Sequence, residues 1–360
     1  MAYSPDASLL SRRSLLAAAG GGAVATVLAA CGSGGRSGSG SSPASGSSSG
    51  AGAGAGAKTG AAGPWSFTDD RKQTVKASSA PTRIVAFTGT AAALVDFGLD
   101  HQIVGVFGET TLPGGKPTAQ AGDLDVGKVT VLGNAWGEFN VEKYASLSPQ
   151  LLVTHMYEPG ALWYVPNESK DQIAKLAPSA AINVARVSLP TPIQRYAELA
   201  QSLGADLTAK KVTDAKARFE TAAETLHTAA KAAGGLKVLA ASGAADVFYA
   251  SNPKIAADLA YFQELGVNVI VPAKLDSGDY FESLSWENAG KYPADLILLD
   301  SRSTALQPAA LASKPSWNAL PAVKAGQVTP WDAVPRFSYA GAAPLLENLA
   351  RAIQNAKKVS

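Results

Sequence analysis

The segment Leu207–Ala232, LTAKKVTDAKARFETAAETLHTAAKA, carries the longest helical pattern of this 360-residue chain. Shorter strand-like and helix-like segments alternate on both sides of it. The segment therefore predicts a rigid spine helix between two α/β lobes, which we expect at residues 64–206 and 234–360, with the spine at 207–233. Its apolar residues recur at spacings of three and four, which predicts one face of a helix about 39 Å long; they are Val212, Ala215, Phe219, Ala222, Leu226 and Ala229.

The first half alternates between short apolar runs and helical patterns. Arg83–Phe87 and Ile103–Val106 read as strands, and a helical pattern between them ends at Gly98. The polar turn that follows Trp65–Thr68 predicts an entry hairpin. Alternation of this kind is typical of mostly parallel sheets covered by helices, so we expect an α/β fold with two Rossmann-like lobes.

A near repeat occurs once in each half. Asn140-Val141-Glu142 leads through a Pro-containing turn into the apolar run Leu151–Val153, and Ser285-Trp286-Glu287 leads in the same way into Leu296–Leu299. A glutamate in a first helical turn suits the helix dipole, so capping alone could explain each one. Its occurrence in both halves favours pseudo-symmetric lobes, the second running from Leu236 to a final helix expected from Ala343 to about Lys358.

The N-terminal residues have the pattern of an export signal. Arg12-Arg13 precede a short apolar stretch, and Leu28–Ala30 precede Cys31, the single cysteine of the chain. The stretch is interrupted by glycines and is shorter than the about 20 apolar residues that span a membrane. We expect residues 1–31 to be a twin-arginine signal peptide with a lipoprotein cleavage site, the general export route being the alternative. Lipidated Cys31 would then anchor the extracytoplasmic protein to the outer face of the cytoplasmic membrane.

Residues 32–63 are almost entirely Gly, Ser and Ala. Such a segment buries too little apolar surface to offset the entropy of ordering it, so we expect a disordered tether. A flexible coil of this length has a root-mean-square reach near ~30 Å. The tether would hold the lobes clear of the lipid surface.

Composition and motifs argue against several function classes. The formal net charge is +2 and the basic residues are scattered, which does not favour nucleic-acid binding. Three histidines and no cysteine beyond Cys31 leave little for a dedicated metal site, and we expect no catalytic residues. Gly122–Val129 resembles a phosphate-binding loop, but Val129 stands where the Mg²⁺-ligating hydroxyl is needed.

The signal, the tether, the two lobes on one long helix and the repeated glutamate units together resemble the periplasmic-binding proteins of iron–siderophore and vitamin B12 ABC importers. The resemblance covers essentially everything from Trp65 onward. It implies a ligand cleft between two lobes that open only slightly, a ferric siderophore as ligand and an ABC permease dimer as partner. It also implies that Glu142 and Glu287 dock onto the permease, and we expect the protein itself to be a monomer.

In doubly wound sheets a ligand lies beyond the carboxyl ends of the strands. The loops at these positions hold many of the aromatic residues and two of the arginines, which suit the skeleton and the anionic oxygens of a ferric chelate. Some ferric-hydroxamate binders of the family use an arginine near the position of Trp136, and this chain has none there. The candidate ligand residues are Trp136, Tyr157, Trp163, Tyr249, Phe281, Arg302, Trp331, Arg336, Phe337 and Tyr339.

Other ligands and one other class of function remain open at this point. Cobalamin or haem is the second choice of ligand within the same family. A bare metal ion is the last choice, because only His155 of the three histidines is well placed. A secreted, lipid-anchored hydrolase is the alternative from another class, although the chain lacks G-x-S-x-G and H-E-x-x-H motifs.

Overall fold

The computed structural model describes residues 63–360, which belong to one compact unit. The predicted signal peptide, Cys31 and the tether up to residue 62 lie outside the described residues. No helix within 63–360 has both the length and the apolar character needed to cross a membrane.

The first lobe is built on a five-stranded sheet in the order β5-β4-β3-β6-β7, with every pair parallel. Its central strands read as continuous apolar runs because helices cover both faces of a parallel sheet. The strands are β3 (Ile84–Phe87), β4 (Ile103–Phe107), β5 (Thr130–Val131), β6 (Leu151–Met156) and β7 (Ser179–Asn183). The helices are α1 (Thr88–Asp96), η1 (Ala119–Ala121), α2 (Val141–Ser146), α3 (Lys170–Leu176) and α4 (Pro190–Ser202).

The second lobe has a six-stranded mixed sheet in the order β11-β9-β8-β12-β13, with β10 also paired to β8. Strands β8, β10, β12 and β13 are parallel, whereas β9 and β11 form antiparallel pairs. The strands are β8 (Lys237–Gly243), β9 (Val247–Ser251), β10 (Asn268–Val269), β11 (Phe281–Ser285), β12 (Leu296–Asp300) and β13 (Val328–Trp331). The helices are α6 (Ala257–Glu264), η2 (Trp286–Lys291), α7 (Pro308–Leu311), α8 (Pro315–Ala319) and α9 (Pro321–Lys324).

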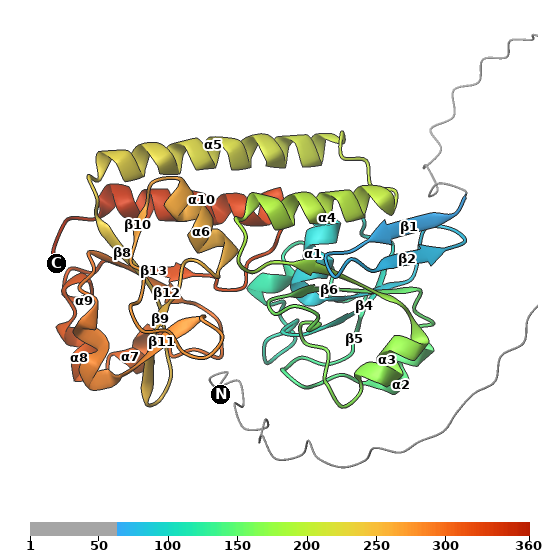
Figure 1. Ribbon diagram of the computed structural model, residues 1–360, viewed down its shortest axis with the longest axis horizontal. Helices are drawn as coiled ribbons and strands as arrows, with labels where there is room; N and C mark the ends of the chain where they lie inside the picture. The colour runs from blue at the N-terminus through green and yellow to red at the C-terminus, as the bar shows by residue number, and fades with distance from the viewer. Residues whose placement is uncertain (1–62) are drawn as a thin grey trace, which may run out of the picture. The chain divides into compact units, whose positions relative to one another are not determined.

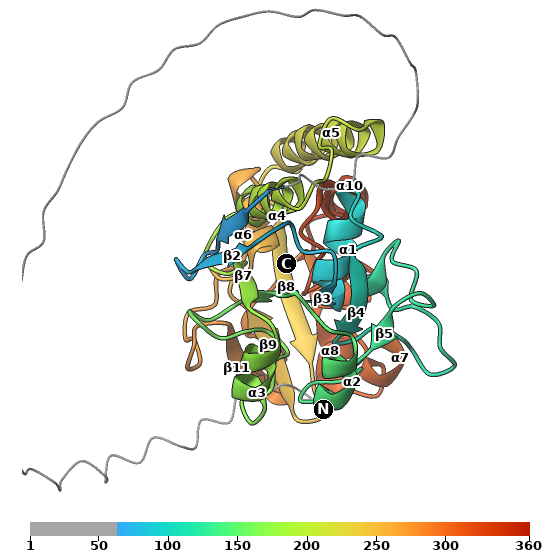
Figure 2. The ribbon, with the colours of Figure 1, turned by 90° about the vertical axis from the view of Figure 1, so that its right-hand side faces the viewer.

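The spine helix α5 (Lys210–Ala232) lies alongside α10 (Tyr339–Asn355), as Figures 1 and 2 show. Its first turns reach the first lobe, where Lys211 Nζ donates to the carbonyl of Val95. Farther along, Phe219 stacks on Tyr261 of α6 at 5.8 Å between ring centroids. The apolar face of α5 thus belongs to a core that continues into both lobes.

The entry hairpin, β1 (Trp65–Thr68) and β2 (Thr74–Ala77), closes one edge of the first sheet. The Asp69 and Asp70 carboxylates accept hydrogen bonds from the backbone N–H groups of Ala181 and Asn183 in edge strand β7, at 3.0 and 2.9 Å. Asp70 N–H in turn donates to the carbonyl of Ala181 at 3.1 Å. Backbone groups that would otherwise face solvent at this edge are therefore paired.

The predicted alternation is confirmed, with two corrections. The second sheet contains the antiparallel hairpin β8–β9 and its neighbour β11, because only the short turn Ala244–Asp246 joins β8 to β9 and a parallel crossover needs a longer connection. The final helix begins at Tyr339 rather than Ala343, because the Ser338 hydroxyl accepts from Gly341 N–H and caps it there.

Candidate functional site

Four aromatic side chains gather beyond the carboxyl ends of β5 and β6. We call Trp136, Tyr157, Trp163 and Tyr164 the aromatic platform. Trp163 lies at its centre, with ring centroids 4.5 Å from Tyr157, 5.0 Å from Trp136 and 5.5 Å from Tyr164. Trp136 is 50 % exposed. The platform offers flat apolar faces with polar edges, which suits an organic ligand.

His155, the fifth residue of β6, lies beneath the platform. It is fully buried among aromatic rings, 4.9 Å from Phe87, 5.3 Å from Tyr157 and 5.6 Å from Phe337 between ring centroids. Burial lowers the pKa of His155 to about 3, so the imidazole is neutral at physiological pH. Neither ring nitrogen has a hydrogen-bond partner within residues 63–360. His155 therefore supports the platform as an apolar ring.

Loop contacts fix the platform from the side of β4. The Asn134 side chain accepts from the backbone N–H groups of Thr110 and Thr111, at 2.9 and 2.8 Å. The Tyr164 hydroxyl donates to Glu109 Oε1 at 3.0 Å. These bonds hold the loops after β4 and β5 together, so the platform is a preorganised surface.

The second lobe contributes Arg302, which follows β12. Its guanidinium forms a fork with Asp300, with Nε to Oδ1 at 3.0 Å and Nη2 to Oδ2 at 2.6 Å. The Asp300 side chain is 0 % exposed and that of Arg302 is 26 % exposed. Burial alone would lower the pKa of Arg302, but the paired carboxylate raises it above its ordinary value. Burial raises the pKa values of Tyr157 and Tyr164, and the charge of Arg302 opposes that rise.

Two further aspartates of the second lobe have raised pKa values. Asp258, in the first turn of α6, accepts from the Trp331 indole N–H at 2.6 Å, and burial raises its pKa to about 6. Asp332 follows β13, and burial together with the charges of Asp258 and Asp300 raises its pKa to about 7, although Arg302 opposes the rise. Near neutral pH both carboxyl groups therefore titrate in a region where like charges meet.

The lobes also meet at an exposed bridge beside the platform. Arg186, after β7, donates to Glu158 Oε1 and to the carbonyl of Gly278 in the second lobe, each at 3.2 Å. The Tyr280 hydroxyl donates to the same Glu158 oxygen at 2.5 Å. The guanidinium of Arg186 lies over the Tyr280 ring, 5.6 Å from its centroid. We call Arg186, Glu158 and Tyr280 the interlobe bridge.

The structure brings together four of the residues expected to bind ligand, namely Trp136, Tyr157, Trp163 and Arg302. Tyr249 on β9 and Phe281 on β11 pair with each other at 5.6 Å between ring centroids. Phe281 also lies 6.1 Å from Tyr280 of the interlobe bridge. These two rings therefore lie on the second-lobe side of the bridge and do not belong to the platform.

The remaining four expected ligand residues pack inside the protein. Trp331 is 6 % exposed and is held by Asp258, and Phe337 is buried, with its ring stacked on Tyr196. Arg336 forms an ion pair with buried Asp96 at 3.2 Å. Tyr339 packs against Phe97 and Phe219 in the same interior. Trp331, Arg336, Phe337 and Tyr339 lie outside the aromatic platform, and their assignment as ligand residues stays a prediction.

Sequence reasoning missed several residues of the site. Tyr164 stands next to Trp163, so the double aromatic was a usable signal. Asp300 could have been paired with Arg302 from the spacing of two residues at the end of an apolar run. No local sequence pattern marked Asp258, Asp332 or Arg186 as a site residue. Only the packing of separate helices and strands shows which groups lie beside each of them.

The two glutamates of the near repeat lie on exposed first turns. Glu142 is in α2, whose N-terminus is capped by Asn140 accepting from Lys143 N–H at 2.8 Å. Glu287 is in the 3-10 helix η2, and bonds to its own backbone N–H and then to Ser285 lower its pKa. Both carboxylates are therefore accessible to a partner.

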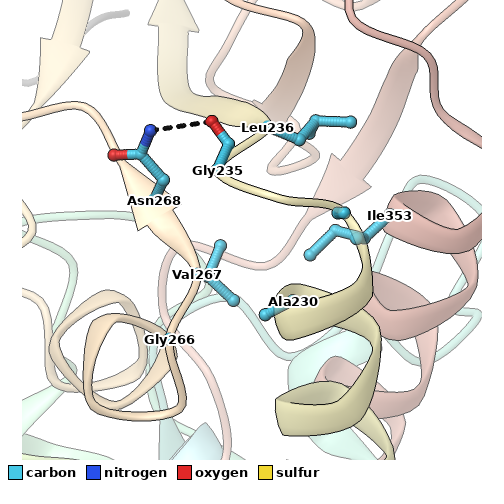
Figure 3. Close-up of a pocket in the computed structure, with 8 residues that line it drawn as sticks. Ala230, Gly235, Leu236, Gly266, Val267, Asn268 and Ile353 are labelled. Atoms are coloured by element: carbon cyan, nitrogen blue, oxygen red, sulfur yellow. Dashed lines mark hydrogen bonds between the residues drawn. The ribbon is translucent and has the colours of Figure 1, made fainter.

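Other regions offer less to a ligand. The cavity in Figure 3 lies at the C-terminal end of α5, where Asn268 donates to the carbonyl of Gly235 at 3.1 Å. Its remaining lining is small or aliphatic: Ala230, Ala233, Leu236, Gly266, Val267 and Ile353. Within residues 63–360, no group of three or more His, Cys, Asp or Glu side chains is arranged to hold a metal ion.

Comparison with known proteins identifies the family to which the fold belongs. The family described as periplasmic binding protein matches residues 84–335. The crystal structure of DesE, a ferric-siderophore receptor protein from Streptomyces coelicolor, is 56% identical, covers 82% of this chain and 100% of its own, and superposes with a TM-score of 0.79. Comparison with curated proteins returned no match.

More distant structures share the fold. The triscatecholate siderophore binding protein FeuA from Bacillus subtilis is 17% identical, with 80% of this chain and 97% of that chain covered and a TM-score of 0.60. The periplasmic heme-binding protein RhuT from Roseiflexus sp. RS-1 is 20% identical, with coverages of 76% and 98% and a TM-score of 0.54. With a family match over most of the described residues and a relative at 56% identity, this chain belongs to the periplasmic binding protein family.

Proposed function

We propose that this protein captures a ferric siderophore outside the cytoplasmic membrane and delivers it to an ABC importer. The observation that carries the proposal is the aromatic platform of the first lobe, where half-exposed Trp136 lies 5.0 Å from Trp163 between ring centroids. A ferric siderophore is a bulky chelate with an organic skeleton, and indole and phenol rings packed edge-to-face provide an apolar surface with polar edges for such a ligand. The 56% identity to DesE, a ferric-siderophore receptor protein, supports the same ligand class.

Delivery would use the exposed glutamates, one on each lobe. Glu142 and Glu287 lie in equivalent units of the near repeat, so a permease dimer could engage both at once. Carboxylates pair well with arginines on a partner surface. In this proposal the protein acts as a monomer, lipidation of Cys31 keeps it beside the permease, and it catalyses no reaction.

The experiment that tests ligand capture is tryptophan fluorescence of the purified protein, titrated with ferric chelates and their iron-free forms. Trp136 and Trp163 lie in the platform, so a bound coloured chelate should quench them. We expect saturable quenching by a ferric chelate with a Kd below about 1 μM, a typical strength for a specific site. Inner-filter controls and calorimetry separate binding from absorption.

The titration panel also includes cobalamin, haemin and Zn²⁺. Tight binding of cobalamin or haemin alone would keep the importer role and replace the ligand. No binding of any member, checked by calorimetry, would contradict capture of a siderophore. Mass spectrometry of the membrane-bound protein before and after a Cys31→Ser change tests the anchor separately.

A further inference from the structure

Arg186, in the loop after β7, contacts both lobes at once. Its backbone N–H donates to the carbonyl of Ile255, just before α6 in the second lobe, at 2.9 Å. Its Nη1 donates to the carbonyl of the platform residue Tyr157 in the first lobe at 3.1 Å. Its Nη2 donates to Glu158 and to the carbonyl of Gly278 in the second lobe, each at 3.2 Å. One residue therefore ties the platform to the opposite lobe.

Both sides of the interlobe bridge are fixed by their own lobes. In the first lobe, the Tyr157 ring packs edge-to-face on Trp163, with 4.5 Å between centroids. In the second, buried Asn252 donates its backbone N–H to the carbonyl of Tyr280 and its side-chain amide to the carbonyl of Asp279, each at 2.8 Å. The bridge therefore joins two preformed surfaces, and moving the lobes apart would break it.

The backbone of Arg186 is strained. Its φ angle is 59°, in the left-handed region that favours glycine over residues with a long side chain. Such conformations persist where neighbouring contacts impose them, and they are frequent at ligand clamps and switch regions. The hydrogen bond from Arg186 N–H to Ile255 of the other lobe is such a contact. Separation of the lobes would therefore free Arg186 to relax.

A second contact between the lobes is much firmer. There Arg336 and Ser338 of the second lobe both donate to Asp96 of α1, whose side chain is 2 % exposed. At the bridge, by contrast, the side chains of Arg186 and Glu158 are 41 % and 47 % exposed. Exposed ion pairs break readily in water, whereas separating a buried pair is costly. The bridge is therefore the contact that opens at lower cost.

We propose that Arg186 is a positioning residue for ligand exchange: together with Glu158 and Tyr280 it latches the two lobes beside the aromatic platform, and a ligand enters and leaves when this latch opens. The latch closes the free and the loaded protein alike, because all of its bonds are between protein groups. This inference rests on the proposed function and deepens it by naming the contact that controls exchange.

The first measurement follows the lobes themselves, without a ligand. In the full-length chain with Cys31→Ser, which leaves no other cysteine, spin labels are attached at Leu176→Cys and Ser313→Cys. Both positions are exposed, at the end of α3 and between α7 and α8, on parts of the lobes that lie away from α5 (Figure 1). Double electron–electron resonance measures the distance between the labels. We expect Arg186→Ala to raise the population at longer distances several-fold, and an unchanged distribution would overturn the latch.

The second measurement follows exchange of two probes, a ferric trihydroxamate and a ferric tricatecholate, by stopped-flow tryptophan fluorescence. Because the latch acts on the free and the loaded protein alike, its loss should raise the association and dissociation rate constants together. For Arg186→Ala we expect both to rise about fivefold with each chelate that binds, so that Kd changes less than about twofold. Tyr280→Phe removes one bond of the latch and keeps the ring beneath Arg186, so it should raise both by less.

Arg218→Ala is the matched control. Arg218 forms a solvent-accessible ion pair with Glu347 at 2.7 Å, which joins α5 to α10 and lies outside the bridge. Its loss should change neither the two rate constants nor the label distances. Thermal melts of every variant confirm that it folds.

A faster dissociation alone in Arg186→Ala, with a correspondingly higher Kd, would overturn the latch, since that outcome would indicate that Arg186 contacts the ligand. Unchanged rate constants would overturn it as well, since Arg186 would then have only a structural role. Failure of both chelates to bind would remove the proposed function and the role in exchange with it, while the label distances would still show whether the bridge holds the lobes together.

Discussion

The two lobes have related architectures, but the sides that face the candidate site differ in chemistry. The first lobe presents four aromatic rings in edge-to-face contact over a neutral, buried His155. The second presents Arg302, whose guanidinium is forked to buried Asp300. The two lobes therefore share a fold unit but not the residues of the candidate site. One lobe supplies contact area and the other supplies charge, so substitutions in the two lobes should alter different properties of binding.

The largest effect on uptake is expected from Glu142 and Glu287, the glutamates of the near repeat that occurs in both lobes. We expect Glu142→Ala together with Glu287→Ala to abolish uptake of a radiolabelled ferric siderophore by cells while leaving its Kd unchanged, because both side chains are exposed and neither belongs to the platform. Glu224→Ala on the spine is the control. Single variants would show whether α2 and the 3-10 helix contribute equally. Normal uptake by the double variant would refute the docking assignment.

The next largest effect should fall on the aromatic side. Trp136→Ala removes a ring that is half exposed, so it should weaken ligand binding by about 10- to 100-fold with little loss of stability. Calorimetry measures the Kd and thermal melts measure the stability. Leu176→Ala, at an exposed apolar position on α3, is the control. A Kd within twofold of the wild type would exclude Trp136 from the ligand surface.

A third prediction concerns how the lobes are joined. Arg336→Ala should lower the free energy of unfolding by about 3 kcal/mol, because it leaves the carboxylate of Asp96 buried without its partner. Arg186→Ala in the exposed interlobe bridge should cost less than about 1 kcal/mol. Denaturant unfolding of both variants gives the comparison. Equal costs would show that the exposed bridge holds the lobes as firmly as the buried ion pair.

The smallest effect is a pH dependence on the charged side. An unfolded aspartate titrates near pH ~4, whereas the pKa of Asp332 in the folded protein is about 7. Between these values the folded state keeps a proton that the unfolded state has lost, so stability falls as pH rises through this window. The Asp332→Asn variant has no carboxyl group at this position, so it lacks this contribution to the fall in stability.

Melting curves of the wild type and Asp332→Asn from pH 4 to pH 8 measure this difference. We expect the two Tm values to coincide near pH 4 and the Tm of the variant to be higher at pH 8, by several degrees. Groups that do not interact with Asp332 titrate alike in both proteins, so their contributions cancel in the comparison. A constant difference across the range would contradict a raised pKa for Asp332.

Much of the fold could be predicted from the sequence because its signals are local. The period of Leu207–Ala232, the apolar strands and the repeated glutamate units each depend on neighbouring residues. The antiparallel β8–β9 pair was missed because apolar runs alone do not reveal strand direction. The fold class was therefore accessible, and the pairing within the second sheet was not.

The candidate site was harder to predict because its groups meet only in three dimensions. Arg336 has the same side chain as Arg302, and its loop position suggested the same role. The difference is a partner 240 residues away in the sequence, Asp96, which holds Arg336 in the interior. Likewise, Asp258 and Asp332 look like ordinary surface acids until α6 and the end of β13 are packed together.

The turn at Asp69 and Asp70 also affects how the protein behaves at high concentration. Proteins tethered to one surface meet their neighbours often, and an open sheet edge invites a strand from the next molecule. Here β7 already gives the N–H groups of Ala181 and Asn183 to carboxylates of its own chain. A strand of another molecule would have to displace both carboxylates before pairing, so this edge resists strand addition even at high protein concentration.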